Sequence, residues 1–257
     1  MKLTRTRPAV FAALLLSGLI TLFSTPPTLL AQDEEAQRPT GLLAGVHLQL
    51  MFPRGDFEKK VDNAGFGLNI DLGYAFPGLP LAAGIEGGFV MYGSDTYTAP
   101  LSTTLPVNVE FTSTNSIIPV HLFLRLQPHV GDFRPYFEGL AGLSVFTTSV
   151  SAKNLNTSEE IAGETKHSDV AWGYGGGGGI MYRVWSGTTN ESNNGMKQPM
   201  EVFIDARLRY IYGGNAKYYT EEAVYKLPDG SIKFDEGKLT SSKTDYVIGQ
   251  LGVVVRL

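Results

Sequence analysis

The residues that could do chemistry in this chain are four histidines, a run of glycines, and a set of arginines and carboxylates. A hydrolase would need a serine or aspartate nucleophile within reach of a histidine. His47 and His121 alternate with apolar residues, which directs them to a polar interior, while His129 falls in a short turn and His167 near the end of a long loop. Neither the H-E-x-x-H nor the G-x-S-x-G spacing occurs. We therefore expect no catalytic residues and no enzyme activity.

A glycine-rich stretch, WGYGGGGGIMYRVW at 172–185, contains the spacing G-x-G-x-x-G at Gly173, Gly175 and Gly178. A dinucleotide-binding fingerprint needs a helix after the glycines and an acidic residue further on. Here the alternation continues after the glycines, and no helix start follows. We interpret the stretch as a strand whose inward glycines make room for arginine and glutamate side chains of adjacent strands.

The sequence also predicts that no metal ion or cofactor is bound. Cysteine is absent, which excludes a disulfide framework and a thiolate metal site. Acidic residues gather in one long loop, but they lack the spacing of a Ca²⁺-binding loop. These residues are Glu221, Glu222, Asp229, Asp235 and Glu236.

The elements that must position these side chains are predicted by an alternation with a period of two. In GFGLNIDLGYAF, 65–76, every second residue from Phe66 to Phe76 is apolar, and the residues between them are small or polar. Because successive strand residues point to opposite faces, this pattern predicts β-strands and excludes helices. The eight predicted strands are 41–52, 65–76, 81–92, 116–126, 135–146, 172–184, 202–212 and 245–257.

The connections between these strands predict the fold class. They are short at 77–80 and 127–132 and long at 53–64, 93–115, 147–169 and 213–244, and the link at 185–201 departs mildly from this alternation. This arrangement is typical of an all-β, eight-stranded antiparallel up-and-down β-barrel. Two short alternating runs flank Pro-Asp-Gly within 224–234, which predicts a hairpin that continues the last two strands beyond the barrel.

Three residues fit the predicted strands poorly. Pro119 lies in the middle of a strand, where its missing N–H suggests a bulge or a strand end. Leu140 and Val254 place apolar side chains on the otherwise polar face.

The polar face indicates whether the barrel is soluble or transmembrane. A soluble, lipocalin-like carrier would expose this face to water and carry lysine on it freely. Instead, the face carries many glycines and charges of both signs, as the narrow bore of an eight-stranded barrel requires. Buried charges must be paired, so we predict a transmembrane barrel with a lumen largely plugged by a charge network. Its predicted members are Asp71, Glu86, Arg125, Glu138, Arg183, Asp205, Arg207, Arg209 and Arg256.

The apolar face agrees with the transmembrane interpretation. It ends repeatedly in aromatic residues, which form girdles at the two interfaces of membrane barrels. The predicted strands, at about 11–13 residues, are long enough to cross the hydrocarbon layer. The predicted girdle consists of Phe52, Tyr74, Phe76, Trp172, Tyr182, Tyr210 and Tyr212.

The N-terminus predicts export. Three basic residues precede an apolar run from Ala9 to Phe23, and this pattern is typical of a secretory signal peptide, 1–31, cleaved after Ala31. Residues 32–40 then form a flexible lead-in and 41–257 the barrel domain. Three of the 21 Lys and Arg residues leave with the signal peptide and all 25 Asp and Glu remain, so the mature net charge is about −7. This charge excludes nucleic acid as a partner.

Several stretches resemble the outer-membrane β-barrel domain family, which includes the small OmpA-like, OmpX-like and opacity-type barrels. The resemblance implies an integral protein of a Gram-negative bacterial outer membrane. It further implies insertion by the barrel-assembly machinery and contact with outer-membrane lipid and lipopolysaccharide. The stretches are Pro53-Arg-Gly-Asp-Phe57, Ile118-Pro-Val-His-Leu122, Arg134-Pro-Tyr136, the glycine-rich sixth strand and the alternating last strand.

We therefore expect an outer-membrane barrel with a structural role in the cell envelope and long surface loops. Two functional alternatives stay open. The loops could bind a surface ligand and make the protein an adhesin, or the barrel could be a narrow, porin-like passive pore. A soluble carrier is the third class, and it requires the apolar face to point inward.

Overall fold

The computed structural model describes residues 41–61, 63–100, 108–154, 160–189, 198–219, 224–226 and 232–257. They belong to one compact unit, Pro39–Leu257. The predicted signal peptide, 1–31, and the whole lead-in, 32–40, lie outside the described residues. No helix in the described part of the chain is long and apolar enough to span a membrane.

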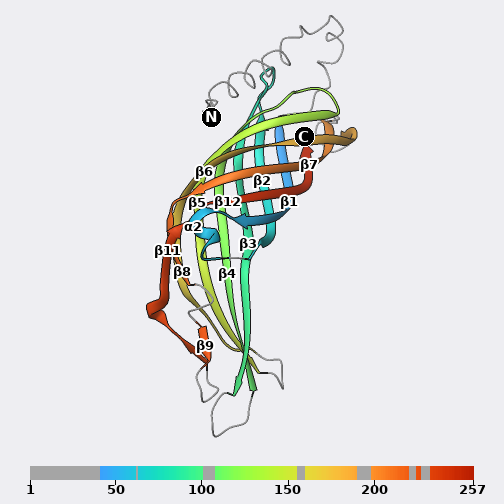
Figure 1. Ribbon diagram of the computed structural model, residues 1–257. Coiled ribbons are helices and arrows are strands. Elements are labelled where there is room, and N and C mark those ends of the chain that lie inside the picture. Colours follow the sequence, from blue (N-terminus) through green and yellow to red (C-terminus); the bar gives the residue numbers. More distant parts are fainter. Residues whose placement is uncertain are drawn as a thin grey trace, which may run out of the picture. The chain divides into compact units, whose positions relative to one another are not determined.

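Eight antiparallel strands close into a barrel in the order β1-β12-β7-β6-β5-β4-β3-β2, which confirms the predicted fold class (Figure 1). The seam joins the first strand to the last, in register from Leu43 opposite Arg256 to Pro53 opposite Tyr246. The barrel strands are β1 (Leu42–Pro53), β2 (Gly65–Ala75), β3 (Leu81–Pro100), β4 (Asn108–Leu126), β5 (Phe133–Asn154), β6 (Glu160–Thr189), β7 (Gln198–Gly213) and β12 (Tyr246–Arg256).

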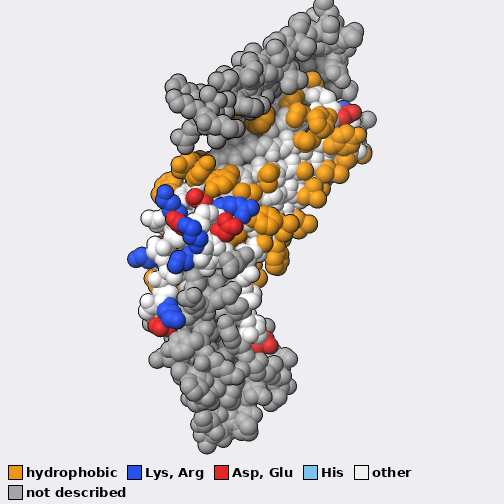
Figure 2. Space-filling model, viewed as in Figure 1, with side chains coloured by type: hydrophobic (Ala, Val, Ile, Leu, Met, Phe, Trp, Pro, Cys, Tyr) orange, Lys and Arg blue, Asp and Glu red, His pale blue; other side chains and the backbone are white. Residues whose placement is uncertain are grey.

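The apolar face of the sheet points outward. Leu122, for example, is 65% exposed on the outer wall, and Leu68 and Ile70 are exposed beside it. Exposed apolar side chains occur on all eight barrel strands, and Figure 2 shows part of this hydrophobic belt on one face of the barrel. This orientation excludes the soluble carrier, because a soluble barrel would bury these residues.

Five strands, β3 to β7, are longer than predicted, and β6 and β7 also take up the described parts of the expected link at 185–201. The segments 93–115 and 147–169 were expected to be loops, but β3 to β6 run through their described parts and continue past the shorter strands (Figure 1). Pairing persists there, with Thr112 opposite both Thr96 and Ser151. These extensions are rich in Thr, Ser and Asn, and their few apolar residues, such as Tyr97, Val109 and Phe111, give too weak an alternation to identify strands, although threonine favours strands.

The segments 53–64 and 213–244, which were expected to be long connections, contain short strands and helices that the alternation only partly predicts. The hairpin within 224–234 is confirmed as β9 (Val224–Lys226) paired with β10 (Ile232–Phe234). However, β7 and β12 do not simply continue, since a separate ladder forms between β8 (Asn215–Tyr219) and β11 (Leu239–Lys243). The short helices are α2 (Gly55–Glu58), which follows β1, and η3 (Glu236–Lys238).

The suspected bulge at Pro119 is wrong. Pro119 pairs with Ser144 of β5, and the register between β3 and β4 is the same on both sides of it. The register between β3 and β4 shifts instead between Met91 and Gly93, and further shifts lie between β5 and β6 and between β6 and β7. Proline cannot donate a backbone hydrogen bond to the ladder. At Pro119 the strand simply lacks that one bond, and no extra residue is inserted.

The bore of the barrel has apolar layers as well as polar ones. Leu140 and Val254, the two misfits of the polar face, are buried in two separate apolar clusters. The cluster toward the long loops contains Met51, Phe57, Val90, Tyr92, Ile117, Phe123, Leu140, Phe146, Ala171, Ile211, Ala216, Tyr218, Tyr246 and Ile248. The cluster toward the short turns contains Leu43, Ala75, Ala82, Tyr136, Met181, Phe203 and Val254.

Candidate functional site

A charged layer lies inside the barrel between the two apolar clusters. Arg209 of β7 donates to Glu138 of β5 at 2.6 Å and to both oxygens of Glu86 of β3 at 2.8 and 2.6 Å. Arg125 of β4 donates to the second oxygen of Glu138 at 3.0 Å. All four side chains are buried, so each guanidinium satisfies carboxylates that water cannot reach.

The second half of this layer is centred on His47 of β1. Its ring nitrogens lie 3.1 Å from Asp71 of β2 and 3.0 Å from Asp205 of β7. Arg207 donates to Asp71 at 2.9 Å and to the amide oxygen of Gln250 at 2.5 Å. The histidine therefore links two carboxylates across the bore.

Seven of the nine predicted network residues meet in this layer: Asp71, Glu86, Arg125, Glu138, Asp205, Arg207 and Arg209. Sequence reasoning placed His47 and His121 in the lumen but did not include them among the network residues. His121 lies 3.3 Å from Glu86. Two further hydrogen bonds of the layer were not predicted. Tyr136 donates to Asp205 at 2.7 Å, and the side-chain amide of Gln250 donates to that of Gln49 at 2.7 Å. Gln49 and Gln250 could have been found by their position on the polar face.

The other two predicted residues, Arg183 and Arg256, lie in a separate cluster at the turn end of the bore. Its centre is Glu201 of β7, which accepts two hydrogen bonds from Arg134 at 3.0 and 3.1 Å. Arg183 contacts Glu201 at 2.5 Å and Asp132 at 2.8 Å, and Arg256 lies 3.6 Å from Glu201. The cluster ties β5, β6, β7 and β12 together. Its centre escaped prediction because residue 201 fell within an expected connection.

The glycines of β6 provide space for bulky side chains in the bore. A Cβ at Gly177 would lie 2.9 Å from Cγ of Arg209, and a Cβ at Gly179 would lie 2.5 Å from the Tyr136 ring. The interpretation of the glycine run as a strand is thus confirmed, and so is the space for an arginine. Tyr136 was not among the expected neighbours.

Phe57, which belongs to α2, lies at the loop end of the bore, inside the barrel. Its ring is fully buried and makes edge contacts with Tyr92 at 5.5 Å, Tyr218 at 5.5 Å and Phe146 at 6.1 Å. Burial raises the pKa of the Tyr218 hydroxyl, which is held by a 2.6 Å hydrogen bond to Ser242. Charged side chains of the middle layer contact the apolar layers directly, because the Arg125 guanidinium lies 5.2 Å from the Phe123 ring and 4.1 Å from the Tyr136 ring.

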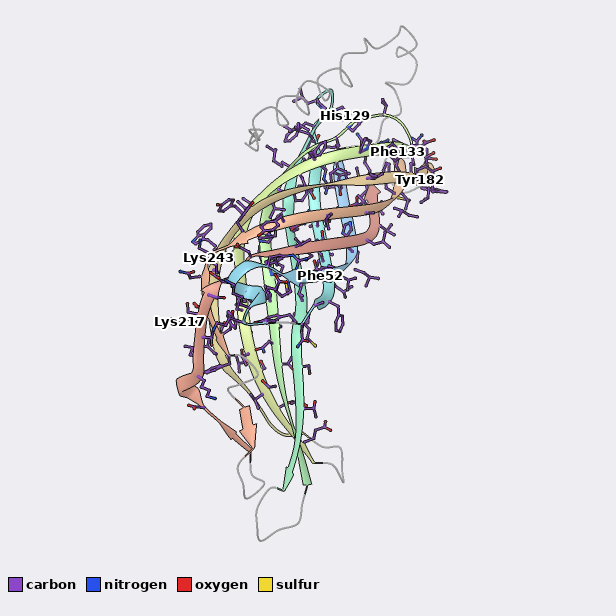
Figure 3. All side chains as sticks on the ribbon, in the orientation of Figure 1. Phe52, His129, Phe133, Tyr182, Lys217 and Lys243 are labelled. Atoms are coloured by element: carbon purple, nitrogen blue, oxygen red, sulfur yellow. The ribbon has the colours of Figure 1, made fainter. Side chains whose placement is uncertain are left out.

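The structure places the seven predicted girdle residues on the outer wall, near two borders of the hydrophobic belt. Figure 3 shows Phe133 and Tyr182 beside the turn at His129, whereas Phe52 lies at the loop-side border. Trp172, at 74% exposure, and Tyr212 also face outward, and Tyr210 is half-buried against Tyr212 at 4.6 Å. Tyr74 and Phe76 lie at the turn side, 5.5 Å apart.

The remaining chemistry-bearing residues are spread over the molecule. The ring of His167 packs against Tyr219 at 5.8 Å, and the backbone oxygen of His129 accepts from Arg256 at 3.4 Å. No group of three or more His, Cys, Asp or Glu side chains suited to a metal ion occurs among the residues that the structure describes. The acidic residues 221, 222 and 229 lie outside the described residues.

Several solved structures are similar to this chain, and three of them are outer-membrane or surface proteins of bacteria. Neisserial surface protein A is 14% identical with a TM-score of 0.40, and the match covers 86% of this chain and 99% of that chain. Ail, the attachment invasion locus protein of Yersinia pestis, is 14% identical with a TM-score of 0.32 and the same coverage. A major outer membrane protein from Thermus thermophilus is 12% identical with a TM-score of 0.37, covering 84% of this chain and 99% of that chain. No curated protein matches the chain.

The family model of the outer membrane protein beta-barrel domain matches residues 15–218, which is most of the chain. The closed barrel, its outward apolar belt and its buried charges agree with that match. The chain therefore belongs to the outer membrane protein beta-barrel domain family and is an outer-membrane β-barrel protein.

Proposed function

We propose that this protein is a structural component of the bacterial outer membrane whose bore is closed to solutes. The observation that carries the proposal is the succession of layers inside the barrel. Phe57 and its aromatic neighbours occupy the loop end, the arginine–carboxylate layer occupies the middle, and the cluster at Glu201 occupies the turn end. An eight-stranded barrel is narrow enough for side chains to fill it.

Planar bilayer recording tests this proposal. The mature barrel is folded in detergent and reconstituted, and its heat-modifiable migration in electrophoresis verifies that folded protein is present. We expect no stable conductance, because three successive layers would have to open together. Stable openings of nanosiemens size would refute the closed bore and favour the narrow passive pore.

Export and insertion complete the proposal. The predicted signal peptide, 1–31, delivers the chain to the periplasm, and the barrel-assembly machinery inserts it among outer-membrane lipids. N-terminal sequencing of protein isolated from the membrane tests the cleavage after Ala31. Surface proteolysis of intact cells tests the orientation, since long loops of such barrels face outward and short turns face the periplasm. A full-length N-terminus, or loops protected from protease, would contradict this part.

A second candidate function is surface binding. The extensions of β3 to β6 and the ladder of β8 with β11 present a polar surface beyond the hydrophobic belt. Such a surface would suit contact with a ligand outside the cell. Because Tyr218 belongs to the buried aromatic group, deleting the whole segment 215–243 would also remove part of the bore packing.

A smaller deletion therefore tests binding more cleanly. Tyr219 lies directly opposite Leu239, so residues 220–238 can be replaced by Asn-Gly as a tight hairpin turn. Loss of cell or surface binding with unchanged heat-modifiable migration would favour adhesion. Unchanged binding would exclude this tip as the binding surface.

A further inference from the structure

His47 is fully buried in the bore, and each of its ring nitrogens faces a carboxylate. Nδ1 lies 3.1 Å from Oδ1 of Asp71 on one side, and Nε2 lies 3.0 Å from Oδ2 of Asp205 on the other. A neutral imidazole carries a single N–H, so only one of these contacts can then be a hydrogen bond. In the other contact, a nitrogen lone pair would face a carboxylate oxygen with no proton between them. An imidazolium carries two N–H groups and donates to both carboxylates.

Two glycines shape the space that the His47 ring occupies. A Cβ at Gly45 would lie 2.8 Å from Cε1 of the ring, and a Cβ at Gly252, which lies opposite His47 on β12, would lie 2.5 Å from Cδ2. The backbone therefore comes close to the ring on two sides and keeps it between the two carboxylates.

Arg207 is the other donor near Nδ1, because its Nη2 lies 3.2 Å from that nitrogen. Nη2 carries two hydrogens. One is donated to Oδ1 of Asp71 at 2.9 Å. The second is donated to the amide oxygen of Asn69 at 3.0 Å, in the amide orientation whose nitrogen also donates to the Gly87 oxygen at 3.2 Å. With both hydrogens of Nη2 used, the proton between Nδ1 and Asp71 must come from His47.

The charges of the middle layer balance only when His47 is positive. Among the residues that the structure describes, the layer contains four carboxylates and three guanidiniums, which leaves one negative charge without a partner. Such a charge is strongly unfavourable where water is excluded, and the imidazolium brings the sum to zero. The ions are Asp71, Glu86, Glu138, Asp205, Arg125, Arg207 and Arg209. The uncharged groups beside them are Gln49 of β1, Asn69 of β2, Tyr136 of β5, Met181 of β6 and Gln250 of β12.

His121 of β4 is the second buried histidine of the layer, and its surroundings are different. Its Nδ1 lies 3.3 Å from Oε1 of Glu86, whereas its Nε2 is buried and has no hydrogen-bond partner. Gly173 lies on that side, since a Cβ added there would come 3.9 Å from Nε2. A neutral ring with its proton on Nδ1 fits this site, because a second N–H would be buried without an acceptor. His121 is therefore a matched control for His47.

We propose that His47 is a proton-binding site and that its imidazolium is a permanent structural cation of the barrel. The bound proton lets a side chain of β1 join Asp71 of β2 to Asp205 of β7 across the bore. The unfolded chain releases this proton above about pH 6.5, as an ordinary histidine does. The folded barrel retains it, because release would leave a bare ring nitrogen against a carboxylate and a layer with a net negative charge. This proton site does not depend on the proposed function, since it needs only the folded barrel.

Imidazole ¹⁵N NMR of the mature barrel, labelled at histidine and folded in detergent, tests the proposal directly. The spectrum distinguishes an imidazolium, with two protonated nitrogens, from either neutral tautomer. At about pH 8.5, about two units above the ordinary pKa of histidine, we expect one doubly protonated ring that disappears in His47→Gln. We expect a singly protonated ring that disappears in His121→Gln. Should His47→Gln fail to fold, single variants of His121, His129 and His167 assign the His47 signal by elimination. A single protonated nitrogen on His47 would overturn the proposal.

The pH dependence of unfolding gives a second, independent readout. The folded barrel holds one proton more than the unfolded chain in mildly alkaline solution, so unfolding releases a proton and the barrel loses stability as the pH rises. The unfolding equilibrium constant of the wild-type barrel should rise about tenfold per pH unit between about pH 7.5 and 9. His47→Gln should remove this dependence, and His121→Gln should preserve it. A flat wild-type profile, or equal slopes for wild type and His47→Gln, would contradict the bound proton. Heat-modifiable migration at each pH verifies that the barrel is folded before denaturant is added.

Discussion

Replacing Arg209 by methionine should destabilise the barrel more than any surface substitution. The guanidinium is 2% exposed and joins two buried carboxylates, Glu86 and Glu138. Glu138 keeps its contact with Arg125 in the variant. Glu86 keeps only His121 at 3.3 Å and Arg207 at 3.8 Å, so it becomes a buried carboxylate with weak compensation.

The size of the effect follows from these contacts. At an effective dielectric constant of about 20, two unit charges about 4 Å apart attract by about 4 kcal/mol. Two such attractions are lost, and the desolvation cost of the guanidinium, which is several kcal/mol, is recovered. The expected net loss is about 3–5 kcal/mol in the free energy of unfolding, as measured for other buried pairs that lose one partner. For Arg183, whose side chain is 31% exposed, the same change should cost about 1 kcal/mol or less.

Equilibrium unfolding in denaturant, from lipid vesicles, measures this difference. Trp172 faces outward and is 74% exposed, so its emission reports transfer from lipid to water. The double variant Arg209→Met with Glu86→Gln should recover much of the loss, because it removes the uncompensated charge as well as its partner. A loss below 1 kcal/mol for Arg209→Met, or a double variant no more stable than the single one, would refute the reasoning.

Three further predictions use the same unfolding assay. Glu201→Gln should destabilise the barrel by about 3 kcal/mol, since Arg134 loses its carboxylate partner, and an effect within error of zero would show that the cluster is dispensable. Gly179→Ala should cost about 1–3 kcal/mol because its methyl group would overlap the Tyr136 ring, whereas Gly87→Ala should be neutral; equal effects would contradict the packing argument. Phe57→Ala should cost about 3–5 kcal/mol and make the loop after β1 more susceptible to protease, and unchanged proteolysis would show that the ring does not anchor the loop.

The sequence was sufficient for the topology and for the direction of the side chains. The alternation around Leu68 and Ile70 predicts which face is apolar, and the absence of lysine from the opposite face indicates that this face is the inside. The same parity placed Arg207 and Arg209 in the bore. These features were predictable because side chains along a strand point alternately to the two faces of the sheet, so every second residue lies on the same face.

Other features could not be read from the pattern. Which arginine meets which carboxylate depends on the relative shift of strands across the bore, so the separation of Arg183 and Arg256 from the central layer had no local signal. Phe57 falls in a segment, 53–64, that the sequence predicts as a connection, and no periodicity there distinguishes an inserted ring from an exposed one. The extensions around Thr96 and Thr112 carry only a few apolar residues, such as Val109 and Phe111, among many Thr, Ser and Asn residues, and so sparse an alternation does not reveal a strand.

The distribution of the charged layer over the strands has a consequence for how the barrel is assembled. His47 comes from β1, Asp71 from β2, Glu86 from β3, Arg125 from β4, Glu138 from β5 and Arg207 from β7. Arg125 and Glu138 lie opposite each other on neighbouring strands and can pair before closure, but Arg207 and Arg209 of β7 meet Asp71 of β2 and Glu86 of β3 only across the bore. A half-open sheet in hydrocarbon would hold these cross-bore ions without their partners, at a cost of several kcal/mol for each. We therefore expect the seam between β1 and β12 to seal together with the pairing of the cross-bore ions, so that the sheet is already curved when the last strand joins it.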